Sequence, residues 1–384
     1  MISEIVYLWS MIDRTIENRI ENKIGRGKAI MIIGPRQVGK TTLIRKYLAN
    51  ADYKFFDGDD PVIREVLNTP NTEEIKMLLG NKKVIFIDEA QRIENIGLTM
   101  KIIIDQFKDV QLWISGSSSF SLYNKLNEPL TGRKWEYQLF PISWEEFENS
   151  QGYLEAKMQL ENRLIFGMYP DVINNPGEET EILQTLVESY LYKDVLSYAG
   201  IKKPEILNKL IRALALQIGS EVNYNELSRM IGIDKNTIEK YINILEQGYV
   251  IFRLPSFSRN IRNEIKKGKK IYFYDNGIRN TVIKSMNGLS FRNDVGELWE
   301  NFLVSERLKQ NSYKIRLVSS YFWRTTQQQE IDYVEEMNMK LYAYEFKWNP
   351  KKKSRISKTF TNKYDAEELV INKDNFREFV IIKN

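Results

Sequence analysis

The residues with the clearest chemical meaning form a loop near the start of the chain, where the pattern G-x-x-x-x-G-K-T occurs at residues 34–41. An apolar run, residues 29–33, enters the loop, and a helix-like run, residues 43–48, leaves it. Glycines let backbone N–H groups turn inward around phosphate oxygens, and the helix start adds partial positive charge. The lysine of this pattern reaches the β- and γ-phosphates, and the next hydroxyl binds Mg²⁺. The sequence therefore predicts a nucleoside triphosphate site at Gly34, Pro35, Arg36, Gln37, Val38, Gly39, Lys40, Thr41 and Thr42, here called the P-loop.

Two acidic residues, Asp88 and Glu89, follow the apolar run 84–87. Phosphate hydrolysis needs one carboxylate to orient Mg²⁺, and a second can polarise the attacking water. We assign Thr41 and Asp88 to the metal and Glu89 to the water. An apolar strand that ends in acids is a weak indication by itself, because loops often begin in this way. Together with the P-loop it predicts a hydrolysis site.

Further polar residues follow or precede predicted strands. Ser115–Ser119 come after the apolar run 111–114, and small hydroxyl groups there can contact the γ-phosphate or the attacking water. A serine turn without chemistry is the alternative. Arg133 precedes the predicted strand 135–139, where a guanidinium can neutralise charge on the γ-phosphate of the same chain or of a neighbouring subunit. Pairing of this arginine with a surface acid is the alternative. The catalytic residues that we predict are Lys40, Glu89 and Arg133.

The composition excludes several kinds of catalysis. The 384 residues include no Cys and no His, which rules out thiol catalysis, disulfides, Cys/His zinc sites and imidazole bases. Carboxylate, lysine and arginine chemistry remains, and it suits Mg²⁺-assisted reactions of phosphates. The length predicts two or three domains. No apolar run approaches the ~18 residues of a membrane helix, and the charged N-terminus is unlike a secretory signal. We therefore expect a cytoplasmic protein with no membrane partner.

The pattern of apolar residues predicts the elements that position these loops. Short apolar runs that indicate buried strands alternate with helical stretches. This alternation is typical of a parallel sheet with helices on both faces, in which ligands bind beyond the carboxyl ends of the strands. Apolar residues at three- and four-residue intervals between Ile5 and Ile24 predict an amphipathic helix before the first strand. Besides the runs given above, the predicted strand is 54–56 and the predicted helices are 62–67, 72–79 and 98–107.

Long helical periodicity from about 141 to 216 leads to a predicted helix–turn–helix. Residues 223–230 form its first helix, Gly232 lies in the turn, and Asp234 caps the second helix. Two apolar runs then flank a basic loop, which indicates a winged-helix layout. In such a module the second helix enters the major groove and the loop contacts phosphates; packing against the P-loop domain, without DNA, is the alternative. The candidates for DNA contact are Lys235, Asn236, Lys240, Arg259, Arg262, Lys266 and Lys267.

Acidic residues recur in the last part of the chain. Glu300 lies on a predicted helix, Asp332 on a predicted strand, and Glu345 and Lys347 on the next strand. This order resembles the PD-(D/E)XK nuclease pattern, in which the acids bind Mg²⁺ and the lysine orients the attacking water or stabilises the phosphate. Alternation of period two places Glu345 and Lys347 on one face of their strand. Because the pattern is short, a nuclease-like fold kept for binding or assembly is the alternative.

Several motifs jointly resemble the AAA-type ATPases of bacteria and archaea that carry a C-terminal domain of unknown function. The resemblance implies an ATPase core, then a winged helix, then a nuclease-like fold, and it leaves the biological role open. Besides the P-loop, the motifs are Phe-Asp-Gly-Asp-Asp (56–60), Ile-Asp-Glu-Ala-Gln (87–91), Ser-Gly-Ser-Ser (115–118), Leu-Thr-Gly-Arg (130–133), Phe-Pro-Ile-Ser-Trp-Glu-Glu (140–146), Tyr-Pro-Asp (169–171) and Tyr-Asp-Asn-Gly-Ile-Arg (274–279).

We expect an α/β protein with a parallel P-loop sheet at residues 1–145, an α-helical and winged-helix domain at 146–285, and a small α/β nuclease-like domain at 286–384. The expected function is a Mg²⁺-dependent ATPase of the AAA type, a nucleotide-driven switch or motor that acts on DNA or a protein client. The alternatives are a nucleotide-gated DNA-binding regulator with little hydrolysis and an ATP-regulated DNA endonuclease. The expected ligands and partners are ATP, Mg²⁺, double-stranded DNA or a protein client, and further copies of the chain in a homo-oligomer.

Overall fold

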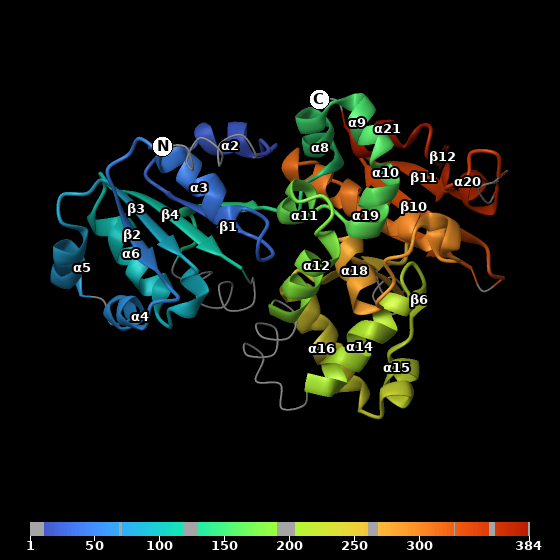
Figure 1. Ribbon diagram of the computed structural model, residues 1–384, viewed down its shortest axis with the longest axis horizontal. Coiled ribbons are helices and arrows are strands. Elements are labelled where there is room, and N and C mark those ends of the chain that lie inside the picture. Colours follow the sequence, from blue (N-terminus) through green and yellow to red (C-terminus); the bar gives the residue numbers. More distant parts are fainter. Residues whose placement is uncertain are drawn as a thin grey trace. The chain divides into compact units, whose positions relative to one another are not determined.

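The chain divides into two compact units in a computed structural model (Figure 1). The P-loop unit comprises Asp13–Pro141 and Gln247–Tyr249, and the second unit comprises Met1–Ile12, Ile142–Glu246 and Val250–Asn384. The structure describes residues 11–68, 71–117, 130–189, 204–259, 268–325, 327–352 and 358–382.

A five-stranded parallel sheet forms the centre of the P-loop unit, with the order β2-β3-β4-β1-β5. The predicted strands are confirmed to within a few residues. All five residues of β1 are buried, as expected for a central strand covered on both faces. Its neighbour β4 presents Trp113, which stacks on Tyr47 with ring centroids 5.4 Å apart. The strands are β1 (Ala29–Ile33), β2 (Tyr53–Asp57), β3 (Val84–Asp88), β4 (Gln111–Gly116) and β5 (Lys134–Gln138).

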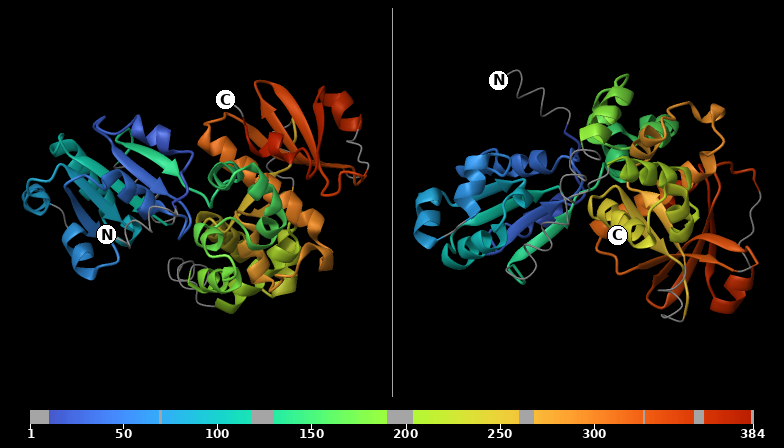
Figure 2. Two further views of the ribbon diagram at one scale, coloured as in Figure 1. Left: turned by 45° about the horizontal axis from the view of Figure 1, so that its top comes forward. Right: turned by 90° about the horizontal axis from the view of Figure 1, so that it is seen from below.

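The strand order determines where the helices lie. The connection from β1 to β2 crosses the sheet in one direction, and the connections through β3 to β4 return in the other. Because such crossovers are right-handed, the helices of the two directions cover opposite faces, and Figures 1 and 2 show helices flanking the sheet. The elements are α3 (Lys40–Leu48) on the outward path, and α4 (Pro61–Asn68), α5 (Thr72–Leu79), η1 (Ala90–Arg92) and α6 (Ile96–Gln106) on the return.

The predicted N-terminal helix was wrong for the described residues. Only α2 (Glu17–Glu21) is helical there, although Ile12, Ile16 and Ile20 are buried as their spacing predicts. The preceding segment is instead held by tertiary contacts, because the Arg14 guanidinium donates to two backbone carbonyls elsewhere in the unit. Such contacts override local helical periodicity. The first half of the prediction, residues 1–10, lies outside the described residues.

After Ile142 the second unit continues with short helices, and glycines stand at two of the breaks between them. Gly152 (φ +90°) and Gly167 (φ +75°) adopt a backbone conformation that other residues avoid. A Cβ at Gly167 would lie 2.0 Å from a carboxylate oxygen of Asp275, so this position also admits no side chain. The long helical region predicted here is therefore a series of short helices that run in different directions. Its members are α8 (Trp144–Gln151), α9 (Tyr153–Met158), α10 (Leu160–Phe166), α11 (Pro170–Asn174), α12 (Glu179–Val187) and α14 (Pro204–Leu216).

Two helices joined by a short turn follow, and an antiparallel pair of strands comes next. Gly232 ends the first helix in a left-handed conformation (φ +80°). The Asp234 carboxylate accepts a hydrogen bond from the Thr237 N–H at 3.0 Å and so caps the second helix. The strands form a sheet with the order β6-β8-β7. These elements are α15 (Tyr224–Ile231), α16 (Lys235–Gln247), β6 (Glu221–Val222), β7 (Ile251–Pro255) and β8 (Lys269–Phe273).

A four-stranded sheet with the order β12-β11-β10-β9 dominates the last part of the chain. The three strands β9 to β11 form an antiparallel meander, and β12 pairs with β11 in parallel. Phe257, Trp323 and Phe360 belong to the buried core beside this sheet. The elements are α19 (Val295–Tyr313), β9 (Ser319–Arg324), β10 (Glu330–Met337), β11 (Lys340–Phe346), α20 (Lys358–Tyr364), β12 (Glu367–Ile371) and α21 (Phe376–Val380).

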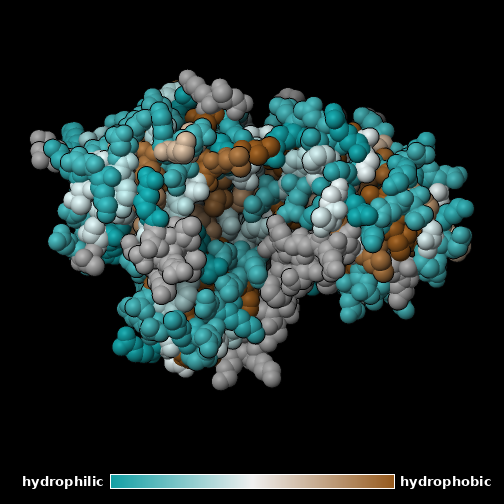
Figure 3. Space-filling model, turned by 180° about the vertical axis from the view of Figure 1, so that it is seen from behind, coloured by the Kyte–Doolittle hydropathy of each residue, from teal (hydrophilic) through white to brown (hydrophobic). Residues whose placement is uncertain are grey.

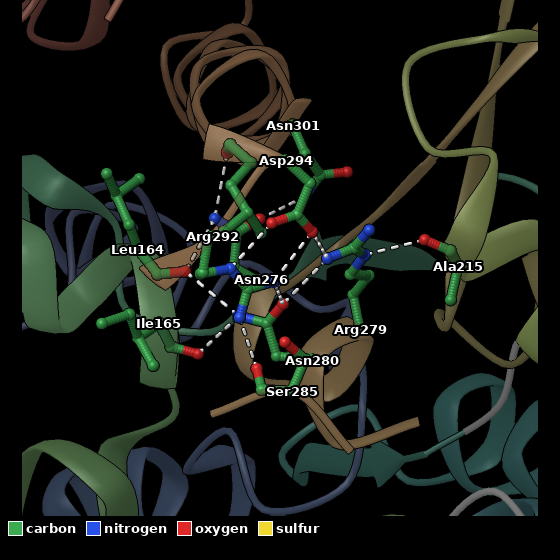
Figure 4. Close-up of polar contacts among 11 residues, drawn as sticks. Leu164, Ile165, Ala215, Asn276, Arg279, Asn280, Ser285, Arg292, Asp294 and Asn301 are labelled. Atoms are coloured by element: carbon green, nitrogen blue, oxygen red, sulfur yellow. Dashed lines mark hydrogen bonds and ion pairs between the residues drawn. The ribbon is translucent and has the colours of Figure 1, made fainter. Parts of the chain in front are cut away.

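The motif at residues 274–279 supplies a buried polar network within the second unit (Figure 4). From α18 (Asn276–Val282), Arg279 donates to the Ala215 carbonyl at 2.8 Å and pairs with Asp294 at 2.5 Å. Asn280, the residue directly after the motif, donates to the Ile165 carbonyl at 2.8 Å. These partners lie in or directly before helices far apart in the sequence. Buried polar groups stabilise a fold only when they are paired in this way. The motif therefore holds helices together.

No helix among the described residues is long and apolar enough to cross a membrane. In the view of Figure 3 the surface of each unit is mostly hydrophilic and carries smaller hydrophobic areas.

Candidate active site

The P-loop follows β1 at the carboxyl end of the sheet. Gly34 has φ +153°, and a Cβ there would lie 1.9 Å from the Leu139 carbonyl oxygen, so only glycine fits. Gly39 (φ +94°) begins α3, and Gln37 is an exposed non-glycine residue with φ +58°. The loop therefore turns sharply between a buried strand and a helix start, which is the geometry that presents N–H groups to an anion.

Lys40 is buried at the first position of α3. Its ammonium donates to the carbonyl oxygens of Pro35 at 2.6 Å and Gly34 at 3.1 Å. Burial lowers the pKa of Lys40 to about 8, although the carboxylates of Glu89 and Asp88 oppose this effect. The ammonium is thus held by two weak acceptors, and phosphate oxygens would satisfy its charge better.

Thr41 and Asp88 meet although 47 residues separate them. The Thr41 hydroxyl donates to Asp88 Oδ2 at 2.8 Å, and the Ser115 hydroxyl donates to Asp88 Oδ1. The sheet order explains the contact, because β4 lies between β1 and β3 and brings the three strand ends side by side. A hydroxyl beside one carboxylate is a donor set that fits Mg²⁺, which keeps waters and takes further oxygens from substrate phosphates. The predicted metal ligands therefore lie together.

Glu89 follows Asp88 directly and has a left-handed backbone, with φ +45° and ψ +40°. Its carboxylate accepts hydrogen bonds from Gln91 and Ser117. The sequence did not predict that these two residues contact Glu89. Ser117 ends the described part of the serine loop; Ser118 and Ser119 lie outside the described residues.

Arg14 is a buried residue that sequence reasoning missed. One guanidinium nitrogen donates to the Val38 carbonyl and another to the Phe140 carbonyl, each at 2.7 Å. Arg14 thereby ties the P-loop to the segment that follows β5. No local signal marks this arginine, because its partners lie 24 and 126 residues away.

Arg133 lies at the other end of the sheet from the P-loop. It precedes β5, and its carbonyl accepts from the Ala29 N–H at the start of β1, whereas the P-loop follows the end of β1. Its side chain pairs with Asp105 at 2.8 Å. A strand of five residues spans about 17 Å. Arg133 is therefore too far from the P-loop, and the interpretation that it reaches the phosphates of its own chain is wrong. A role toward a neighbouring subunit stays a prediction.

The residues predicted to contact DNA are only partly described. Lys235, Asn236 and Lys240 are exposed along α16. Arg259 is exposed and its guanidinium lies 5.8 Å from the centre of the Tyr364 ring. The remaining candidates, Arg262, Lys266 and Lys267, lie outside the described residues.

The structure places the acidic residues of the C-terminal pattern close together. Asp332 accepts a hydrogen bond from the Phe346 N–H at 2.8 Å, and Lys347 donates to Glu345 at 2.8 Å. Burial and the carboxylates of Glu300 and Glu345 raise the pKa of Asp332 above its ordinary value. Within the described ranges, however, no group of three acids is arranged to hold a metal ion.

A lysine from β8 enters this acidic cluster, which sequence reasoning missed. The Lys270 ammonium is buried and pairs with Glu300 at 2.9 Å and Glu330 at 2.6 Å. Burial alone would lower the pKa of Lys270, but the carboxylates of Glu300, Asp332 and Glu330 outweigh burial and raise it. The Tyr272 hydroxyl also donates to Glu300, at 2.6 Å. The cluster is therefore occupied by protein groups.

Family comparisons agree with the geometry of the P-loop unit. Residues 26–148 match the family described as AAA domain. Residues 157–289 match a domain of unknown function, DUF8612, and residues 295–382 match another, DUF4143. Residues 26–148 are thus similar to an AAA-type, ATPase-like domain, and the matches agree with a chain that combines such a domain with a C-terminal domain of unknown function.

Similar proteins include an uncharacterized protein of Mycobacterium tuberculosis, 26% identical over 334 residues, which are 86% of this chain and 72% of that protein. An uncharacterized protein of Haemophilus influenzae is 25% identical over 303 residues, 73% of this chain and 74% of that protein. Among solved structures, the Walker-type ATPase of Pyrococcus abyssi is 15% identical with a TM-score of 0.49, over 71% of this chain and 96% of that chain.

Proposed function

We propose that the P-loop unit binds ATP with Mg²⁺ and hydrolyses the terminal phosphate bond. The observation that carries this proposal is the hydrogen bond of 2.8 Å between the Thr41 hydroxyl and Asp88 Oδ2 at adjacent strand ends. It joins the two predicted metal ligands beside a loop shaped for phosphates. The AAA-domain match of residues 26–148 supports the same function.

The residues divide the chemistry between them. Lys40 would leave the carbonyls of Gly34 and Pro35 and bind the β- and γ-phosphates. Thr41 and Asp88 would hold Mg²⁺, which supplies neutralisation of phosphate charge. Glu89 would accept the proton of the attacking water. The backbone N–H groups of residues 35–40 would surround the phosphate oxygens.

Steady-state ATP turnover of Glu89→Gln tests the assignment of the base. We expect turnover to fall by about a hundredfold or more while ATP affinity is kept, because the amide cannot accept the proton. Lys40→Ala should lose affinity itself. Glu94→Gln, an exposed residue five positions later, is the matched control and should behave as wild type. Normal turnover in Glu89→Gln would falsify the assignment.

We also propose that hydrolysis drives a switch or motor whose client is DNA, contacted by a winged helix. A helix pair with a turn at Gly232, followed by the β7–β8 pair, supports this module. Three exposed polar residues on α16 support a phosphate or base contact. Duplex DNA should then stimulate turnover and bind less tightly as salt rises. If ATP turnover stays at background with and without DNA, the alternative is favoured, a nucleotide-gated DNA-binding regulator with little hydrolysis. If the enzyme hydrolyses ATP but DNA has no effect on turnover, a protein client is indicated.

An ATP-regulated endonuclease is the second alternative. A nuclease is favoured by the closeness of three residues, Asp332, Glu345 and Lys347. The Lys270 ammonium among the same carboxylates disfavours it. Plasmid nicking that is lost in Asp332→Ala and kept in Lys40→Ala would support cleavage.

A further inference from the structure

The backbone of Glu89 adopts an unfavourable conformation that neighbouring residues impose. A positive φ is uncommon for a glutamate, and its value here is +45°. Gly58 donates its N–H to the Asp88 carbonyl at 2.9 Å. A Cβ at Gly58 would lie 2.5 Å from the Glu89 carbonyl oxygen and 2.8 Å from that of Asp88, so only glycine permits this approach. An ion pair between Asp59 and Arg92, 3.1 Å long, joins the same two loops.

The side chain of Glu89 is held as firmly as its backbone. Gln91 donates from Nε2 to Glu89 Oε2 and, at 2.8 Å, to the Ser117 hydroxyl. That hydroxyl in turn donates to Glu89 Oε2 at 3.1 Å, and the Ser117 N–H donates to Gln91 Oε1 at 3.3 Å. Both Gln91 and Ser117 are almost fully buried, with exposures of 1% and 3%. The three side chains form a closed triangle between the ends of β3 and β4.

The triangle engages only one of the two carboxylate oxygens. Within the described part of the chain, Glu89 Oε1 accepts no hydrogen bond, so it stays available to a water molecule. Donors that bind a carboxylate fix its rotamer. A general base needs this property, because it must be correctly placed before the water arrives.

We propose that Gln91 and Ser117 are positioning residues for hydrolysis, which fix Glu89 so that its free oxygen faces the attacking water. Gly58 contributes because it has no side chain and so leaves room for the left-handed backbone of Glu89. This inference rests on the proposed ATPase function. It adds a role for residues outside the P-loop and the acidic pair.

Turnover and binding measured separately on Gln91→Ala test the proposal. We expect kcat to fall by about a hundredfold, as for other small misplacements of a catalytic group, while the Kd of a non-hydrolysable ATP analogue stays within about twofold. Ser117→Ala should act in the same direction. Gln106→Ala, an exposed glutamine at the end of α6, should leave both quantities unchanged.

A double variant separates positioning from a general loss of structure. If Gln91 acts through Glu89, adding Gln91→Ala to Glu89→Gln should lower kcat no further, because the base is already absent. A further decrease, an unchanged kcat in Gln91→Ala, or an equal loss of analogue affinity overturns the proposal. If wild-type protein fails to bind or hydrolyse ATP, the proposed function fails instead, and the two results are therefore distinguishable.

A second inference comes independently from the acidic cluster of the second unit. We infer that the Lys270 ammonium is the resident cation of Glu300, Glu330 and Asp332, in the place where a nuclease would take up a divalent metal. The ammonium is 1% exposed and lies within 3 Å of two of these carboxylates. A metal ion there would have to displace a buried charge that the same carboxylates stabilise.

Titration with Mn²⁺ in the absence of nucleotide, followed by electron paramagnetic resonance, tests this inference. We expect wild-type protein and Asp332→Asn to bind Mn²⁺ equally weakly, because Asp332 offers no metal site while Lys270 is present. Stronger binding by wild type than by Asp332→Asn overturns the inference. Lys270→Gln, if circular dichroism shows it folded, should gain Mn²⁺ binding; a folded Lys270→Gln without this gain also contradicts it.

Discussion

Lys40 and Arg14 both hydrogen-bond to backbone carbonyls of the P-loop, but only Lys40 belongs to the motif. The sequence singled out Lys40, Thr41 and Asp88 as candidates because their spacing and neighbours are local features. It could not predict Arg14 or the pairing of Gln91 with Ser117, because those contacts join residues far apart in the chain.

The affinity for ATP should depend on pH through Lys40. Its pKa is lowered to about 8 by burial, so the free protein loses this charge as pH rises above 8. Bound phosphates favour the ammonium and raise the pKa again, so binding takes up a proton. We expect affinity to fall by up to about tenfold from pH 8 to pH 9. Calorimetry in two buffers of different ionisation enthalpy measures both the affinity and the proton.

Lys40→Arg provides the control for this pH dependence. A guanidinium keeps its charge throughout the range, so any affinity that the variant retains should be the same at pH 8 and pH 9. Equal affinities of wild-type protein at pH 7 and pH 9 would contradict the role given to Lys40.

Elements with a strong local pattern were predictable, and those shaped by distant contacts were not. The five strands of the P-loop unit follow apolar runs, since a central parallel strand is buried on both faces. The helix expected between Ile5 and Ile24 is limited to α2 among the described residues, because Arg14 is held by two carbonyls elsewhere. The order β2-β3-β4-β1-β5 is likewise not a local property, although it is what brings Asp88 to Thr41.

The network around α18 should be important for the stability of the second unit. Arg279→Met removes a hydrogen bond to Ala215 and an ion pair with Asp294, and it leaves the carboxylate with fewer partners. Breaking a buried pair of this kind costs about 3–5 kcal/mol. Urea unfolding measures the loss. Arg229→Met on the exposed face of α15 is the matched control, expected within about 0.5 kcal/mol of wild type; equal effects of the two variants would contradict the structural role of the motif.

At the scale of the whole molecule, the position of Arg133 bears on assembly. Arg133 lies at the amino-terminal ends of the strands, and the P-loop of its own chain lies at their carboxyl ends. It can therefore act on ATP only across a subunit boundary. If it does so, Arg133→Ala should lose most turnover, because a guanidinium at the γ-phosphate contributes about a thousandfold or more.

Mixing two inactive variants tests this arrangement. Lys40→Ala cannot bind ATP but still carries Arg133, whereas Arg133→Ala binds ATP but lacks the guanidinium. A mixed oligomer should recover turnover, and the recovery should depend on total protein concentration. If Arg133→Ala is fully active, the arginine serves only its ion pair with Asp105.

Arg14 has one more consequence. Phe140, whose carbonyl shares the Arg14 guanidinium with Val38, stands one residue before Pro141, where the continuous stretch of the P-loop unit ends. Gly34 also lies against Leu139. A displacement of the phosphate-binding backbone by a fraction of an ångström would therefore also move residues 139 and 140. The movement would reach the segment of the chain that leaves the P-loop unit after Pro141.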